Sequence, residues 1–176
     1  MQIAQTHRLL LRHFRPADAD ALMHIFGDSD VMFYGTGAKD RAWVERWLAA
    51  VIEQDYPNWG FGLWAVVLKA NDALIGYCGL SQFKDLGGQP EVEIGYRLRK
   101  SHWGQGLATE AAIAVRDYFF TTLKLPRLVA MIDPRNTASI NVATKLGMHY
   151  EKDVVFQGFL DRLYVIEQTG DPSQGR

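Results

Sequence analysis

The 176-residue sequence is 48% hydrophobic and 22% charged, and its formal net charge is −1. That length suits one domain with a sizeable core and leaves little room for a second. Acidic and basic residues nearly balance, which argues against a protein that wraps nucleic acid, because such proteins usually carry a basic excess. The single cysteine, Cys78, excludes an intramolecular disulfide and a cysteine-rich metal site. The five histidines have no metal-ligand spacing, so we expect no metal.

The sequence also carries no signal for a membrane. Residues 1–6 lack the charged start and apolar run of a secretion signal. No stretch approaches the roughly 18 apolar residues that a membrane-spanning helix needs. We therefore expect a cytoplasmic protein without a membrane partner.

The N-terminal third predicts one strand followed by two helices. The apolar run at residues 8–14 is typical of a strand, and Pro16 ends it. A helix then begins near Pro16 with acidic residues in its first turn, where the helix dipole favours them. Between Asp40 and Gln54, apolar residues recur with the 3.6-residue period of a second helix.

The middle of the chain predicts three strands of a meander, at residues 63–69, 74–80 and 91–97. Asn71-Asp72 and Gly87-Gly88 mark the turns between them. A helix follows from Gly106 to about Thr122, because its apolar residues form one stripe at helical spacing.

The last third predicts a strand at residues 128–132, a helix that Asn136 opens and Gly147 closes, and strands at 150–156 and 162–168. The order β-α-α-β-β-β-α-β-α-β-β predicts an α/β fold with a single mixed central sheet and flanking helices. We expect one domain over residues 1–168 and a disordered polar tail at 169–176.

A strand, a loop and a helix follow one another directly between Glu91 and Phe119. Gly104 and Gly106 allow backbone amides to approach a ligand without obstruction by a Cβ atom. The first-turn amides of a helix have no intrahelical acceptor, and the helix dipole adds positive charge, so this place suits a phosphate. Four potentially cationic residues precede the loop: Arg97, Arg99, Lys100 and His102.

Neither of two familiar phosphate loops fits these residues. A Walker A loop needs Gly-Lys followed by Ser or Thr, which is absent. The dinucleotide fingerprint needs a third glycine, where this sequence has Thr109. On spacing alone, a plain glycine turn between a strand and a helix is the alternative interpretation.

The run Trp103-Gly-Gln-Gly-Leu-Ala-Thr-Glu-Ala111 resembles the acetyl-CoA pyrophosphate loop of the GNAT superfamily of N-acetyltransferases. Gly106 and Ala108 match that family's pattern, whereas Trp103 stands where Arg or Gln is commonest. The stretch from Asn136 to Met148 resembles the family's other cofactor-contacting helix. Residues 6–12 and 60–65 are similar to the branch that contains the ribosomal-protein N-terminal acetyltransferases, and the resemblance covers about residues 6 to 168.

The resemblance implies a transferase that moves an acetyl group from acetyl-CoA to a primary amine directly, through a ternary complex. The amine is that of a protein N-terminus or of a small molecule. The alternative is a catalytically idle domain that binds acyl-CoA as a sensor or interaction surface. A homodimer is common in such families. The cofactor contacts that the resemblance implies are Tyr96, Arg97, Leu98, Arg99, Trp103, Gly104, Gln105, Gly106, Leu107, Ala108, Thr109, Asn136 and Ser139.

Acetyl transfer needs a neutral amine, a stabilised oxyanion and a departing thiolate. Glu93 is the first candidate for the base, because it shares a strand face with Gly95 and Arg97. Glu91 is the second, and deprotonation through waters is a third possibility; both carboxylates could also be ordinary solvated residues. A backbone amide near Leu98 is the candidate oxyanion donor.

The family's usual acid is a tyrosine seven residues after the helix-opening Asn. Counting from Asn136 reaches Ala143, so that tyrosine is absent. Ser139 is the remaining hydroxyl, and a Ser in this motif has that role in the ribosomal branch. A first-turn Ser can also simply cap its helix.

Aromatic residues are the candidates for an acceptor pocket, although most aromatic residues belong to a core. Tyr34 is the best of them, because it lies beside a glycine loop between the first two predicted helices. We expect Cys78 to be a packed core residue. The other pocket candidates are Trp59, Trp64 and Phe83, with Phe33 and Phe61 considered beside them.

Overall fold

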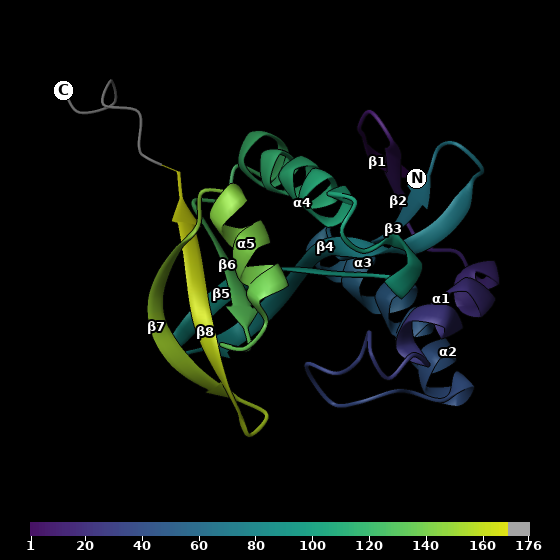
Figure 1. Ribbon diagram of the computed structural model, residues 1–176. Helices are drawn as coiled ribbons and strands as arrows, with labels where there is room; N and C mark the ends of the chain where they lie inside the picture. Colours follow the sequence, from purple (N-terminus) through teal and green to yellow (C-terminus); the bar gives the residue numbers. More distant parts are fainter. Residues whose placement is uncertain (169–176) are drawn as a thin grey trace.

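The computed structural model describes residues 1–168, so the predicted tail at 169–176 lies outside the described residues. One eight-stranded sheet runs through the molecule in the order β1-β2-β3-β4-β5-β6-β8-β7 (Figure 1). Neighbouring strands are antiparallel except β5 and β6, which are parallel. The strands are β1 Gln2–Gln5, β2 Leu9–Arg12, β3 Leu63–Leu68, β4 Ala73–Leu86, β5 Gln89–Leu98, β6 Arg127–Ile132, β7 His149–Phe156 and β8 Phe159–Glu167.

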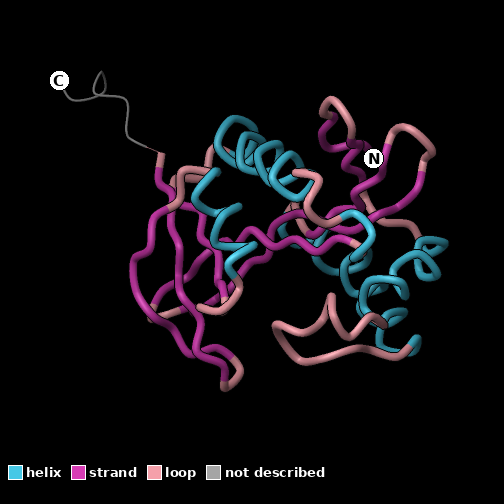
Figure 2. The backbone as a smooth tube through the Cα atoms, viewed as in Figure 1, coloured by secondary structure: helices cyan, strands magenta, loops and turns pink. Residues whose placement is uncertain are grey.

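Helices cover both faces of this sheet (Figure 2). Helices α1 (Ala19–Phe26) and α2 (Arg41–Ala50) bury their apolar stripes on one face, against β3 and β4. Helices α4 (Leu107–Tyr118) and α5 (Thr137–Lys145) pack on the other. The short α3 (Tyr56–Trp59) follows α2 after a π-helical segment, Val51–Asp55. The predicted mixed sheet with flanking helices is confirmed.

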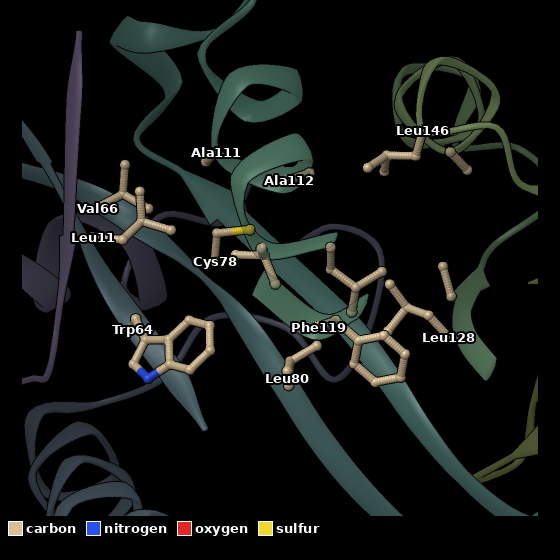
Figure 3. Close-up of a cluster of buried hydrophobic side chains, with 14 of the residues drawn as sticks. Leu11, Trp64, Val66, Cys78, Leu80, Ala111, Ala112, Phe119, Leu128 and Leu146 are labelled. Carbon is tan, nitrogen blue, oxygen red and sulfur yellow. The ribbon is translucent and has the colours of Figure 1, made fainter. Parts of the chain in front are cut away.

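The core between the sheet and α4 contains Cys78, whose sulfur points toward that helix (Figure 3). Ala111 and Ala112 of α4 are fully buried, and their small side chains let the helix lie close to the strands. Cys78 is also fully buried, and burial raises the pKa of its thiol. It is therefore a packed, unreactive residue, as the sequence predicts.

The N-terminus differs from the prediction of one strand. Two short strands, β1 and β2, form a hairpin, and only β2 matches the predicted run. Strand β1 was missed because it is an edge strand without a fully buried residue, so no apolar pattern marks it. The second and third meander strands are longer than predicted: β4 reaches Leu86, and β5 begins at Gln89, after Gly87 and Gly88 make the turn with positive φ. Strand β3 matches its predicted range to within one residue.

Strands β5 and β6 are in register only at Glu93 and Val129. Beyond that pair β6 continues beside β8, and β5 continues beside β4, so the two parallel strands diverge. The C-terminal half of β5 therefore has one edge without a strand partner. An unpaired strand edge presents backbone amides and carbonyls to whatever occupies the gap.

Candidate functional site

The loop between β5 and α4 is an open turn made by two glycines. Gly104 and Gly106 have φ of 71° and 76°, a region that side chains with a Cβ rarely adopt. A Cβ at Gly104 would have no neighbour within 4 Å, and one at Gly106 would meet only Arg8 Nη2, at 3.6 Å. Gly106 is the N-cap of α4 and offers no capping side chain. The first-turn amides of α4 are thus available to an anion.

Trp103 braces this loop rather than supplying a cation. Its indole Nε1 donates to the Leu98 carbonyl at 2.8 Å, and Gln105 Nε2 donates to the Ser101 carbonyl at 3.1 Å. Trp103 is nevertheless 48% exposed. The first bond ties the loop to the end of β5, and the second ties it to the turn at Lys100–His102.

The open edge of β5 lies just before the loop. The Arg99 amide donates to the Ile75 carbonyl at 2.8 Å, toward β4. Successive peptide groups along a strand point to opposite sides, so the Leu98 amide points into the gap between β5 and β6. The candidate oxyanion donor of the sequence analysis therefore faces the gap.

Helix α5 flanks the gap and begins with a capped turn. The Asn136 side-chain oxygen accepts from the Ser139 amide at 3.1 Å, which makes Asn136 the N-cap. The Tyr96 hydroxyl donates to the Ser139 carbonyl at 3.2 Å and so joins β5 to this turn. Burial raises the pKa of Tyr96, so its hydroxyl stays protonated. Ser139 is half-buried, and its carbonyl contacts the Tyr96 side chain of β5.

Glu93 lies where the two strands separate. Its carboxylate accepts from the Met131 amide at 3.3 Å. This bond joins β5 to β6 two residues beyond Val129, the residue of β6 that pairs with Glu93. Burial raises the pKa of Glu93 to about 7, against the opposing effect of that hydrogen bond; Asp161 raises it further and Arg97 lowers it. A carboxyl with such a pKa is both ionised and protonated near neutral pH, as a general base requires.

The comparisons with known proteins agree with this geometry. A family model described as an acetyltransferase (GNAT) domain matches residues 8–149. The chain belongs to the GNAT acetyltransferase family. The uncharacterized protein YkkB of Bacillus subtilis (strain 168) is 37% identical over 150 residues, covering 85% of this chain and 86% of that one. The uncharacterized N-acetyltransferase p20 of Bacillus licheniformis is 32% identical over 153 residues, covering 86% and 84%.

Solved GNAT structures share the whole fold. An acetyltransferase from Agrobacterium tumefaciens has a TM-score of 0.83 at 27% identity and covers 96% of this chain and 95% of that chain. A ribosomal L7/L12 alpha-N-protein acetyltransferase in complex with coenzyme A has a TM-score of 0.75 at 15% identity, covering 97% and 100%. The predicted family and the predicted N-acetyltransferase class are both confirmed.

Glu91, the second candidate base of this GNAT domain, is a structural residue. It is 3% exposed, and its carboxylate accepts from Arg127 Nε at 3.0 Å and from Gln89 Nε2 at 2.6 Å. Both of these bonds go to Oε1, and Arg127 Nε also donates to Oε2 at 3.2 Å. Because the carboxylate is buried and bonded in this way, Glu91 is not exposed to an incoming amine. Glu93 remains the carboxylate of the gap.

Residues 27–40, between α1 and α2, form a loop that contacts both sides of the gap. The Tyr34 carbonyl accepts from Arg97 Nη2 at 2.8 Å, and the Tyr34 hydroxyl donates to the Arg135 carbonyl at 3.2 Å. Lys100 pairs with Asp30 of the same loop. Arg97 and Lys100 therefore bind this loop with their side chains, whereas the sequence analysis assigned their charge to the phosphate loop.

The structure separates the four predicted pocket aromatics. Trp64 is fully buried and packs edge-on against Tyr118 at 5.3 Å, so its assignment to an acceptor pocket is wrong: it is a core residue between the sheet and α4. Phe83 packs edge-on against Phe156, near β7, and Trp59 ends α3 with 44% exposure. Within residues 1–168, Tyr34 is the one of the four whose hydrogen bonds reach both β5 and the start of α5.

Arg8 and Glu110 form an ion pair that was not predicted from the sequence. Arg8 lies in the turn between β1 and β2, and its Nε donates to Glu110 of α4 at 2.7 Å. Residues 6–12 carried part of the family resemblance, but no local pattern indicates a contact across 102 positions.

Within residues 1–168, no group of three or more histidine, cysteine, aspartate or glutamate side chains is placed to hold a metal ion. The same residues include no helix long and apolar enough to cross a membrane.

Proposed function

We propose that this N-acetyltransferase transfers the acetyl group of acetyl-CoA directly to a primary amine within a ternary complex. The observation that carries the proposal is the gap between β5 and β6: an amide from Leu98 faces it, Glu93 lies where it closes, and the glycine loop and capped α5 flank it. Acetyl-CoA supplies an activated acetyl thioester. The protein supplies the binding, the orientation and the proton transfers.

For cofactor binding, the glycine loop favours a phosphate at the amides of residues 104–109. The space beside Gly104 and Gly106 is open, and the α4 dipole favours an anion there. The pantetheine arm then has the free edge of β5 as a hydrogen-bonding partner. Asn136 and Ser139 lie at the other side of that edge, joined to it through Tyr96.

For proton transfer, Glu93 is proposed to accept the proton of the attacking amine. Its pKa of about 7 leaves a substantial fraction ionised at neutral pH. The Leu98 amide is proposed to donate to the thioester oxygen as negative charge develops there. Ser139 is proposed to donate a proton to the departing sulfur, since Ala143 stands where other family members carry a tyrosine.

For the acceptor, two chemical classes remain, a protein N-terminus and a small amine. The spermidine N(1)-acetyltransferase of Escherichia coli (strain K12) is 38% identical, but over 67 residues that cover 38% of this chain. The ribosomal-protein acetyltransferases among the solved structures share the fold at 15–19% identity. Neither likeness selects the amine.

The test is release of free CoA thiol from acetyl-CoA in the presence of peptides with different N-terminal residues and of polyamines and other small amines. We expect turnover with members of one class well above the hydrolysis seen without an amine. Tight acetyl-CoA binding without turnover on any amine would instead support the idle acyl-CoA-binding domain.

A further inference from the structure

The β1–β2 turn is fastened to the first turn of α4 through Glu110. The Arg8 amide donates to one carboxylate oxygen at 2.8 Å, the Thr6 hydroxyl donates to the same oxygen, and Arg8 Nε donates to the other at 2.7 Å. Partial burial acts to raise the pKa of Glu110, but the bonds from Thr6 and Arg8 outweigh it and lower that pKa. Glu110 is therefore an ionised anchor for the Arg8 guanidinium.

A second bond fixes the orientation of that guanidinium. Arg8 Nη1 donates to the Gln105 carbonyl, inside the glycine loop, at 2.9 Å. With Nε and Nη1 both engaged, the planar group cannot rotate, and Nη2 lies 3.6 Å from the position that a Cβ on Gly106 would take. The side chain is still 40% exposed. A cation is thus held rigidly beside the open amides of α4.

Trp103 and two of the four cationic residues that precede the loop do not place a positive charge there. Position 103 carries a tryptophan whose indole is bonded to the Leu98 carbonyl. Arg97 and Lys100 are turned to the loop at residues 27–40. Arg8, which comes from a distant strand turn, has its free edge toward Gly106.

We propose that Arg8 binds a phosphate group of acetyl-CoA at the glycine loop. This inference rests on the proposed cofactor site. A guanidinium N–H makes a strong, charge-assisted hydrogen bond to a phosphate oxygen, and a preoriented guanidinium loses little side-chain entropy on binding. The anionic phosphate bridges Arg8 Nη2 and the first-turn amides of α4, two donors that the fold already holds together.

The test uses calorimetry with a series of ligands that lose phosphates stepwise: CoA, 3′-dephospho-CoA, 4′-phosphopantetheine and pantetheine. For the Arg8→Gln variant we expect the affinity for CoA to fall roughly 10-fold or more, as for loss of a hydrogen bond to a charged group. Pantetheine, which has no phosphate, should bind both proteins equally. The step at which the difference first appears identifies the 4′-linked phosphate, the diphosphate or the 3′-phosphate.

The matched control is Arg116→Gln, since Arg116 lies on α4, the helix that Arg8 contacts, but bonds Asp117 and the Leu146 carbonyl instead of the loop. It should leave CoA affinity unchanged. Arg8→Lys, which keeps the charge, replaces Arg8→Gln in the test if the latter does not fold. It should also lose affinity for the phosphate-containing ligands and bind pantetheine as the unaltered protein does.

Three outcomes overturn the inference. An equal loss of affinity for all four ligands assigns Arg8 to structure alone, because pantetheine has no phosphate and its binding cannot depend on a phosphate contact. Unchanged CoA affinity in the folded variant removes the contact. Failure of the unaltered protein to bind CoA overturns the proposed function itself, and the Arg8 inference with it.

Discussion

At the scale of single residues, Glu93 combines a position at the closed end of the gap with a pKa raised to about 7. If it is the base, kcat/KM should rise with pH through about 7 as the carboxylate forms. Glu93→Gln keeps an acceptor for the Met131 amide but cannot take a proton. We expect turnover to fall about 10²–10⁴-fold and the rise near pH 7 to disappear, as steady-state kinetics across pH will show.

The same substitution should change stability in the opposite sense. A carboxyl whose pKa is raised in the folded protein destabilises the folded state once the pH exceeds the pKa of the unfolded chain. The full cost is present above the folded pKa of about 7. Glu93→Gln should therefore unfold at a higher temperature than the unaltered protein at pH 8, with a smaller difference at pH 5. Unchanged turnover in that variant would leave deprotonation to water.

The proposed catalytic role of Ser139 can be tested without removing the helix cap, because the Asn136 side chain provides the cap. Ser139→Ala should lower turnover by roughly 10² or more, as loss of a general acid does. CoA affinity and melting temperature should change little, since the hydroxyl acts when charge develops on sulfur. Thr144→Ala, on the same helix with its hydroxyl bonded to the Ile140 carbonyl, is the control and should stay active. A fully active Ser139→Ala protein would point to solvent as the proton source.

At the scale of elements, the glycine loop can be tested by its backbone. Gly106→Val introduces a β-branched side chain at φ 76°, in the space proposed for phosphate. We expect a severe loss of acetyl-CoA affinity, measured by calorimetry. Gly158→Val is matched for backbone strain, because Gly158 has φ 83° and no neighbour within 4 Å of a Cβ, in the β7–β8 turn. Both variants should be less stable, but only the first should lose affinity.

The elements that the sequence predicted well are those with local signals. Gly87-Gly88 makes the β4–β5 turn, Asn136 caps α5, and Gly147 follows it with φ 85°. These depend on residues a few positions apart. Edge strand β1 and the π-helical ends of α2 and α4 have no such signal, because their backbone is set by packing and pairing with distant segments.

The candidate site divides in the same way. The glycine loop and the Asn136 turn were predicted because each is a short contiguous motif. Three other hydrogen bonds of the site join residues 38, 63 and 102 positions apart. They are those of Glu93 with Met131, Arg97 with Tyr34 and Arg8 with Glu110. Only the folded chain shows them, and the burial of Trp64 was missed for the same reason.

At the scale of the whole molecule, the gap is also a junction between two parts of the sheet. Strands β1–β5 meet β6, β8 and β7 at the single register pair of Glu93 and Val129. Arg127, the first residue of β6, reinforces this junction by bonding Glu91 of β5, Glu151 of β7 and Glu167 of β8, at 2.8–3.0 Å. The strand pairing that Arg127 supports lies beside the proposed base.

Removing Arg127 should therefore destabilise the protein far more than removing a surface arginine. Arg127→Met leaves Glu91, whose side chain is 2% exposed, buried without its cation, which costs roughly 3–5 kcal/mol. Arg41→Met is the control, because Arg41 is 54% exposed and its ion pairs, screened by water, contribute little to stability. The double change Glu91→Gln with Arg127→Met removes the buried charge as well, so it should recover part of the loss. Urea denaturation of the four proteins measures these differences, and equal costs for the two arginines would show that the junction does not depend on this ion-pair network.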